Sequence, residues 1–122
     1  MALRSLIVDD NAHFLASASD LLEREGVRVV GVASDGAEAV RLAEALQPDV
    51  TLVDIDLGDE SGFDVARRLS EAAGPRDLRV VLISTYPETD FTDLIAASPA
   101  AGFLPKSELS GDAIEELLDR AR

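Results

Sequence analysis

Residues 51–62, TLVDIDLGDESG, decide the fold of this chain. The apolar run Leu52-Val53 stops at Asp54, and a second acid, Asp56, follows two residues later. A continuous apolar run, rather than one that alternates with polar residues, is typical of a strand that is covered on both faces. An acid that ends such a strand stands either in a solvated turn or at a reactive position, and the rest of the chain decides between the two.

Short β-rich runs and helical segments alternate along the whole chain. Strands are expected at residues 3–8, 27–33, 49–54, 78–84 and 102–105. The spacing of apolar residues predicts helices at 14–22, 34–48, 63–73 and 114–121, with a shorter and weaker one around Leu94 and Ile95. This alternation predicts a three-layer α/β domain on a parallel sheet with right-handed crossovers. We expect residues 1–122 to form this one domain.

The sequence also marks where helices begin and end. Asp35 and Glu38 have the spacing of a capping box, and Pro48 is expected to end the same helix. Gly26 closes the first helical segment, and Gly74-Pro75 end the third. No linker, repeat or low-complexity segment interrupts the pattern.

Composition argues against several classes of function. The 122 residues carry a formal net charge of −13, which repels phosphate backbones, so we expect no direct binding of nucleic acid or of an anionic membrane. The absence of cysteine excludes disulfides and thiolate metal sites, and it suits a cytoplasmic protein. No signal-peptide pattern opens the chain, and no apolar run approaches the roughly 18 residues that span a bilayer. Divalent cations or a basic partner surface fit this charge better.

Reactive side chains follow four of the five expected strands. The first strand ends in Asp9-Asp10, the third in Asp54, the fourth in Ser84-Thr85 and the fifth in Lys106. The carboxyl ends of parallel strands meet at one edge of a sheet, where such folds bind their ligands. We therefore expect three carboxylates, a hydroxyl and an ammonium at this edge, although polar residues also stand at strand ends as ordinary helix caps.

The chemistry of this set is specific. Facing carboxylates repel one another unless a cation lies among them. An all-oxygen site suits a hard ion, and Mg²⁺ held by a few carboxylates and waters is the natural candidate. The ammonium and the hydroxyl would contact phosphoryl oxygens, and a carboxylate can be the nucleophile that forms an acyl phosphate. The set therefore predicts Mg²⁺-dependent phosphoryl transfer onto an aspartate.

Four motifs in order, LIVDDN, VTLVDIDLGDESGFD, VVLIST and GFLPK, resemble the receiver domain of bacterial two-component response regulators. The resemblance runs over essentially the whole chain. It implies a flavodoxin-like (βα)5 fold with a five-stranded parallel sheet in the order 2-1-3-4-5. It also implies a cytoplasmic signalling protein rather than an enzyme, which receives its phosphoryl group from a histidine on a sensor kinase.

The resemblance assigns the acids by position. Asp54 matches the phospho-accepting aspartate. Asp10 matches a direct ligand of Mg²⁺, and Asp9 matches an acid that acts on the ion mostly through water. The backbone carbonyl of Asp56 matches a further metal ligand.

The resemblance also assigns the residues of a switch. Ser84 aligns with the hydroxyl that moves toward the phosphoryl group, and Lys106 with the phosphate-binding lysine. Phe103 falls where receivers keep an aromatic residue whose inward turn accompanies activation. The change is expected to bias the surface built from the fourth helix, the fifth strand and the fifth helix, through which receivers commonly form homodimers.

Two positions are expected to set the lifetime of the phosphorylated state, because in receivers they border the path of the attacking water. They are Asp56, two residues after the acceptor, and Tyr86, two residues after the hydroxyl. We expect Tyr86 to slow hydrolysis by shielding Asp54, and the alternative is that it packs on the fourth helix. The Asp56 carboxylate either orients water or crowds the phosphoryl charge, and the sequence does not decide between the two.

The chain departs from the receiver pattern at two positions. Many receivers have proline four residues after the acceptor, where this chain has Gly58, so we expect a more mobile loop. Many follow the lysine with a proline in a cis peptide, whereas here Ser107 follows and Pro105 precedes. GFLPKSEL resembles receivers that carry a helix-turn-helix DNA-binding module. That module is not within these residues, so we expect either a single-domain regulator or a receiver excised from a longer one.

Two other functions stay open. The DID of residues 54–56 resembles the D-x-D of haloacid-dehalogenase-type phosphatases, which also use Mg²⁺, but the acidic pair comes first here and last in that family. The other is a pseudo-receiver, a module with this fold that binds partners without being phosphorylated. His13 is expected to be a surface residue, and Asp59 and Glu60 are expected to form a solvated loop.

Overall fold

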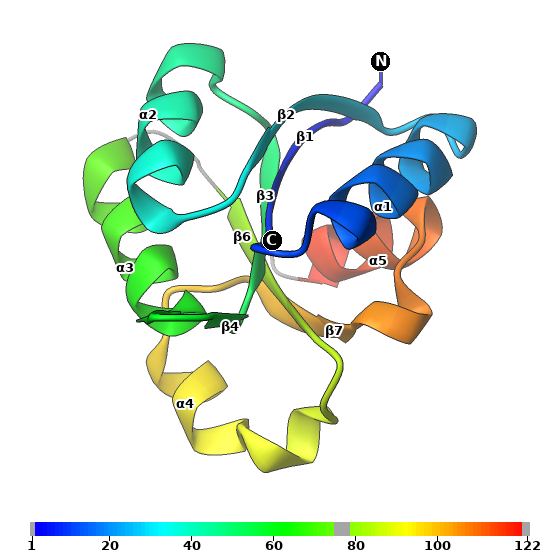
Figure 1. Ribbon diagram of the computed structural model, residues 1–122. Helices are drawn as coiled ribbons and strands as arrows, with labels where there is room; N and C mark the ends of the chain where they lie inside the picture. Colours follow the sequence, from blue (N-terminus) through cyan, green and yellow to red (C-terminus); the bar gives the residue numbers. More distant parts are fainter. Residues whose placement is uncertain (1, 75–78, 121–122) are drawn as a thin grey trace.

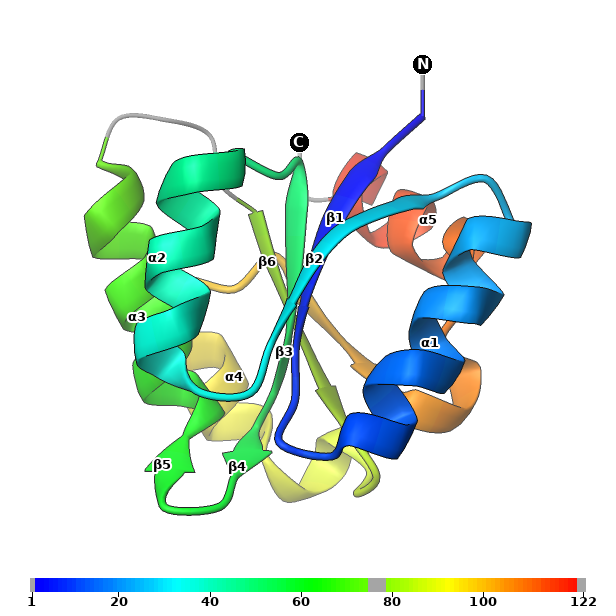
Figure 2. The ribbon, with the colours of Figure 1, turned by 45° about the horizontal axis from the view of Figure 1, so that its top comes forward.

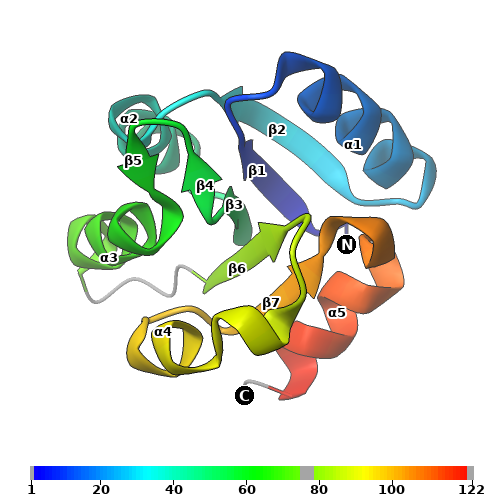
Figure 3. The same ribbon diagram turned by 60° about the horizontal axis from the view of Figure 1, so that its bottom comes forward.

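The computed structural model describes residues 2–74 and 79–120, and its centre is a five-stranded parallel sheet (Figure 3). The strands are β1 (Arg4–Val8), β2 (Arg28–Ala33), β3 (Val50–Asp54), β6 (Arg79–Ser84) and β7 (Gly102–Pro105). Their order is β2-β1-β3-β6-β7, which is the predicted order 2-1-3-4-5 when these strands are counted along the chain. The predicted flavodoxin-like α/β fold is confirmed.

In the described residues, five α-helices cover the two faces of the sheet (Figures 1 and 2). They are α1 (Ala12–Arg24), α2 (Gly36–Leu46), α3 (Gly62–Ala73), α4 (Thr92–Ala97) and α5 (Gly111–Arg120). α1 and α5 lie on one face, and α2, α3 and α4 lie on the other. Pro75, Leu78 and Ala121 of the expected elements lie outside the described residues. None of the helices described is long and apolar enough to cross a membrane.

Each face of the sheet has its own apolar core, because successive side chains of a strand point to opposite faces. Val53 and Leu82 lie in the core beneath α2 and α3. Their sequence neighbours Leu52 and Ile83 lie in the core beneath α1 and α5. β3 is buried along its whole length, as its continuous apolar run predicts. Its last residue, Asp54, is therefore held on a rigid strand.

The ends of α2 follow the predicted signals with one difference. Asp35 is the N-cap, and its side chain accepts a hydrogen bond of 2.8 Å from the backbone N–H of Glu38. The Glu38 carboxylate accepts from the N–H of Ser34, at 2.8 Å, and this is one residue earlier than in a standard capping box. α2 ends before Pro48, where Gln47 adopts the left-handed conformation with φ 48°.

The acidic loop after β3 is a small antiparallel hairpin that the sequence analysis did not foresee. It consists of β4 (Asp56–Leu57) and β5 (Glu60–Ser61), joined by the two residues Gly58-Asp59. Gly58 has φ 76° and Asp59 does not have a positive φ, which is the pattern of a type II′ turn with glycine at its first central position. A proline cannot adopt this φ. Gly58 therefore fits a defined turn of a short hairpin, and the greater mobility of this segment stays a prediction.

Glu60 is not the solvated loop residue that the sequence predicts. Its side chain is partly buried, because Oε2 accepts a hydrogen bond of 3.1 Å from the backbone N–H of Gly36 at the start of α2. Its Oε1 lies 3.6 Å from the guanidinium of Arg68 on α3. Asp59, by contrast, is exposed as predicted. Glu60 thus fastens the hairpin to the two helices on that side of the sheet.

Candidate functional site

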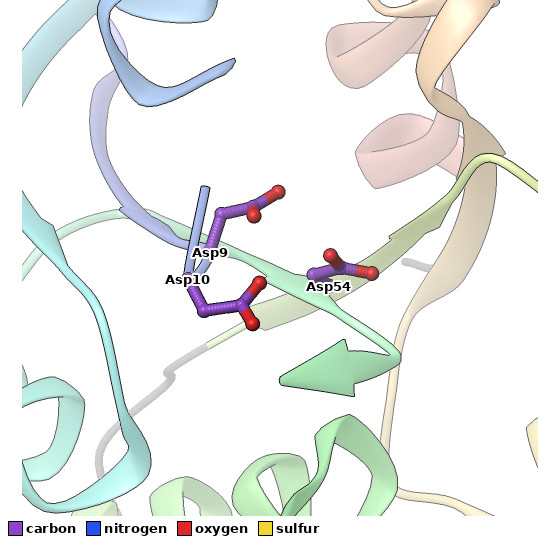
Figure 4. Close-up of side chains that lie close together, drawn as sticks. All are labelled: Asp9, Asp10 and Asp54. Carbon is purple, nitrogen blue, oxygen red and sulfur yellow. The ribbon is translucent and has the colours of Figure 1, made fainter. Parts of the chain in front are cut away.

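Three carboxylates meet at the carboxyl ends of β1 and β3. Asp9 and Asp10 follow β1, Asp54 ends β3, and the two strands pair side by side. One carboxylate oxygen of each residue lies within 4.8 Å of those of the other two. Figure 4 shows the three side chains directed toward a common space. The expected gathering of acids at this edge is therefore present, with Asp9 and Asp54 buried and Asp10 exposed.

Lys106 lies between two of these acids, and it is the one lysine of the chain. Its Nζ is 2.7 Å from Asp9 Oδ2 and 3.1 Å from Asp54 Oδ2. Burial lowers the pKa of this ammonium, but the contacts with Asp9 and Asp54 more than offset burial, and the pKa lies above the ordinary 10.5. Lys106 is therefore charged at neutral pH and neutralises part of the negative charge of the site.

Hydrogen bonds hold the Asp54 carboxylate through both of its oxygens. Oδ1 accepts a hydrogen bond of 3.1 Å from the backbone N–H of Asp56, and Oδ2 accepts one from Lys106. Burial raises the pKa of Asp54 above 3.8, and these hydrogen bonds oppose the rise without cancelling it. The charge of Asp9 raises this pKa further. A further cation beside Asp54 would stabilise its ionised form.

The donor set fits a hard divalent cation. Asp9 Oδ1 accepts the N–H of Asn11 at 2.9 Å, whereas Asp9 Oδ2 is buried and receives no well-aligned hydrogen bond from the described residues. The Lys106 ammonium lies 2.7 Å from this oxygen. Asp9, Asp10 and Asp54 thus offer closely spaced carboxylate oxygens, which are the ligands that Mg²⁺ prefers. Asp56, whose carbonyl is a predicted ligand, lines the same pocket.

An open pocket of about 280 Å³ lies over the acids. Its wall includes Ser84, Thr85 and Tyr86, from the end of β6 and the loop that follows. Ser84 Oγ accepts a hydrogen bond of 2.9 Å from the backbone N–H of Tyr86, which leaves the hydroxyl hydrogen of Ser84 as a donor. The carboxylates, hydroxyl and ammonium expected at the strand ends therefore line one pocket.

Tyr86 lines this pocket, and the residue is 56% exposed. The ring meets the edge of Phe91, the residue before α4, with 6.4 Å between ring centres. Phe91 in turn contacts Phe63 of α3 at 6.3 Å. Tyr86 thus borders the pocket and packs on the residue before α4, and the shielding of Asp54 stays a prediction.

The remaining predicted residues are placed as follows. Phe103 is 5% exposed and lies in the core beneath α2 and α3. Its turn on activation stays a prediction. His13 is exposed on the first turn of α1, as predicted. The described residues contain no cis peptide bond. The bond between Lys106 and Ser107 is therefore trans.

Two residues of the site escaped the sequence analysis. The Nζ of Lys106 lies 4.2 Å from the centre of the Phe14 ring, which is a cation–π contact. Asn11 is the N-cap of α1, and its side chain accepts hydrogen bonds from the backbone N–H groups of His13 and Phe14. The available signal was the NAHF that follows the acidic pair, where a capping residue precedes an aromatic residue by three positions.

This geometry agrees with comparisons with known proteins. Residues 5–119 match the family described as "Response regulator receiver domain". The chain belongs to this family. The transcriptional regulatory protein PdtaR of Mycobacterium tuberculosis is 33% identical in an alignment of 122 positions that covers 98% of this chain and 58% of PdtaR. The receiver chain therefore spans a little over half the length of this curated relative.

Solved structures of receivers show the same fold. The signal receiver domain of the response regulator NarL from Mycobacterium tuberculosis is similar with a TM-score of 0.82 and 32% identity, over 98% of this chain and 96% of that one. A response regulator from Burkholderia pseudomallei has a TM-score of 0.82 and 26% identity, over 98% of this chain and 68% of that one. That structure holds a phosphorylated aspartic acid, a calcium ion and citrate.

Family membership narrows the classes of function left open by the sequence to those of a receiver domain. It makes this receiver a component of two-component signalling. It gives no support to the haloacid-dehalogenase-type phosphatase that the DID of residues 54–56 resembles.

Proposed function

We propose that residues 1–122 act as one phospho-accepting switch, in which Asp54 receives a phosphoryl group from the phosphohistidine of a cytoplasmic sensor kinase. The observation that carries this proposal is the position of Lys106, whose ammonium contacts Asp54 Oδ2 at 3.1 Å and Asp9 Oδ2 at 2.7 Å. A cation held beside a nucleophilic carboxylate is placed to meet the charge of an incoming phosphoryl group.

The reaction needs a nucleophile and no redox partner. A carboxylate oxygen of Asp54 forms a bond to phosphorus while the bond from phosphorus to the histidine nitrogen breaks, and the electron pair of that bond stays on the nitrogen. Lys106 and the hydroxyl of Ser84 would donate hydrogen bonds to the phosphoryl oxygens. Both groups line the pocket over Asp54, and the hydroxyl hydrogen of Ser84 is free to turn toward it.

The metal in this proposal is Mg²⁺. Asp9, Asp10, Asp54 and the backbone carbonyl of Asp56 would hold it, and when bound it supplies positive charge to the phosphoryl oxygens. The spacing of the three carboxylates supports this ligand set, as does the buried Asp9 Oδ2, which accepts no well-aligned hydrogen bond from the described residues. The ion would also relieve the repulsion among three acids that Lys106 alone does not neutralise.

The output is a change at the surface formed by α4, β7 and α5. Ser84 would move toward the phosphoryl group, and Phe103 would respond to the space this movement leaves. A hollow of about 550 Å³ on this surface, lined in part by Ile95, Phe103 and Leu117, supports a role in association. We propose that phosphorylation favours a homodimer through this surface. If the phosphorylated and the unmodified protein have the same oligomeric mass in solution, phosphorylation does not favour the dimer.

Intact mass after incubation with acetyl phosphate tests the central step. We expect the mass of one phosphoryl group to be added with Mg²⁺ and not with EDTA, and Asp54→Asn to remain unmodified. The same gain should follow incubation with a phosphorylated sensor kinase. A folded protein that neither donor modifies would instead act as a pseudo-receiver, which signals by binding alone.

A further inference from the structure

The ammonium of Lys106 is one member of a closed series of contacts that also includes Asp9, Asn11 and Phe14. Asp9 Oδ1 accepts the N–H of Asn11 at 2.9 Å, and Asn11 Oδ1 accepts the N–H of Phe14 at 3.1 Å. The ring of Phe14 lies 4.2 Å from Lys106 Nζ, and Nζ returns to Asp9 Oδ2 at 2.7 Å. Asn11, the N-cap of α1, thus fixes the backbone of Phe14, and the ring of Phe14 contacts the lysine.

The ring differs from the other partners of Lys106 in one respect. Asp9 and Asp54 are charged oxygen ligands, so any divalent cation that enters the site competes with the lysine for them. The face of Phe14 attracts an ammonium through its quadrupole and is no ligand for Mg²⁺. Phe14 is also partly buried against the core beneath α1 and α5, which limits the movement of the ring.

We infer that Phe14 is a positioning residue that keeps the Lys106 ammonium over the acceptor pocket while the carboxylates around it exchange the lysine for a metal ion. Without the ring, the lysine loses the one described partner that a cation does not displace, and its long side chain spreads over more rotamers. This inference rests on the proposed function for its effect on rate, but the position of the lysine can be measured without any phosphorylation.

The first measurement uses the fact that the chain has a single lysine. Protein labelled with ¹³C at the lysine ε-carbon gives one lysine signal by NMR, and its ε-protons report the ring current of Phe14. We expect an upfield shift in the wild type and in Phe14→Tyr, which keeps the ring, and its loss in Phe14→Leu. The shift should persist as Mg²⁺ is added. A wild-type signal that moves to the Phe14→Leu position on adding Mg²⁺ would overturn the inference.

The second measurement separates the electrostatic role of the ring from its packing. Phenylalanine with one, two or three ring fluorines, incorporated at position 14 alone, keeps the shape of the ring and weakens its attraction for a cation. We expect the rate of phosphorylation by acetyl phosphate to fall with each fluorine, and Phe14→Leu to be about three- to tenfold slower than the wild type. If Phe14 acts only through packing, the rates of phosphorylation should be equal along the fluorine series, and that result would contradict the inference.

Two controls keep the outcomes distinct. Tyr86 is the one tyrosine of a chain without tryptophan and lines the pocket, so its fluorescence measures Mg²⁺ affinity in the wild type, in Phe14→Leu and in the fluorinated proteins, which we expect to bind Mg²⁺ equally well. Urea unfolding shows whether a variant is folded. If the wild type itself takes up no phosphoryl group, the proposed function fails, and the lysine signal alone then decides whether Phe14 holds the ammonium.

Discussion

Replacing Lys106 with methionine should lower the free energy of unfolding of the metal-free domain by about 3 kcal/mol. Methionine keeps an unbranched apolar side chain and removes the ammonium. The change leaves Asp9, which is 0% exposed, and Asp54 without the cation that now lies 2.7 and 3.1 Å from their oxygens. Two buried carboxylates then face each other with no opposite charge between them.

The magnitude follows from these distances. With an effective dielectric constant of about 20, unit charges separated by 2.7 and 3.1 Å attract by roughly 6 and 5 kcal/mol. The dehydration of the ammonium offsets much of this, and removal of one partner from a buried ion pair typically costs about 3–5 kcal/mol. The Lys106 side chain is 14% exposed beside an open pocket, which places the cost at the lower end. For a urea m-value of about 1.5 kcal/mol/M, the unfolding midpoint should fall by about 2 M.

The assay is urea unfolding followed by far-UV circular dichroism, first in EDTA and then with saturating Mg²⁺. Mg²⁺ should stabilise Lys106→Met more than the wild type, because the ion supplies the missing positive charge. The matched control is Arg41→Met, which removes an exposed cation 3.7 Å from Glu38 and should cost at most about 0.5 kcal/mol. Equal stabilities of the two variants in EDTA would show that Lys106 does not neutralise the acids.

The pH dependence gives a second check on the same variant. Burial already raises the pKa of Asp54 above 3.8, and loss of the hydrogen bond and charge of Lys106 raises it further. Because the folded pKa then exceeds the unfolded one, ionised Asp54 costs stability at neutral pH, and this cost fades as the pH falls through the folded pKa toward 3.8. The deficit of Lys106→Met should therefore shrink on acidification. A deficit that grows over this range would contradict the assignment.

Four further substitutions test three separate features. Thr51→Val should raise the free energy of unfolding by about 1 kcal/mol in urea, because the Thr51 hydroxyl is buried and has no hydrogen-bond partner among the described residues. Gly62→Ala should lower the free energy of unfolding by about 3 kcal/mol, because a Cβ there collides with the backbone carbonyl of Asp54. The control is Gly26→Ala, which has open space around the new Cβ and should cost about 1 kcal/mol because of the φ of 87° alone. Tyr86→Ala should speed the loss of phosphate from Asp54, measured by mass against time, by roughly two- to fivefold if the ring shields the bond. An unchanged rate would leave Tyr86 a packing residue only.

The sheet and the acidic site were predictable from the sequence because both follow from patterns along single strands. A continuous apolar run predicts a strand buried on both faces, and a parallel sheet brings the carboxyl ends of such strands to one edge. The proximity of Asp9, Asp54 and Lys106 was therefore predictable without any knowledge of side-chain packing. The order of the strands came from the family resemblance, since the strand ranges alone allow other orders.

The hairpin after β3 and the role of Phe14 were not foreseen, for different reasons. Strands of two residues are too short to show a periodic pattern, although Gly58-Asp59 is itself a recognised hairpin turn pair. The neighbour of Glu60 at the start of α2 is 24 positions away in the chain, and no local pattern specifies it. The contact of Phe14 with Lys106 depends on the direction in which α1 leaves β1, and only the folded structure provides this.

The choice of cation at the site is itself informative. The chain has ten arginines and one lysine, and the lysine is the cation that lies among the acids. An arginine would pair with a carboxylate through a rigid planar fork, and such a bidentate pair is hard to exchange. An ammonium is a compact charge that contacts Asp9, Asp54 and the ring of Phe14 at once. Lysine therefore suits a site whose carboxylates must bind a metal ion and whose cation must bind a phosphoryl group. Lys106→Arg should fold with near wild-type stability but be phosphorylated more slowly than the wild type.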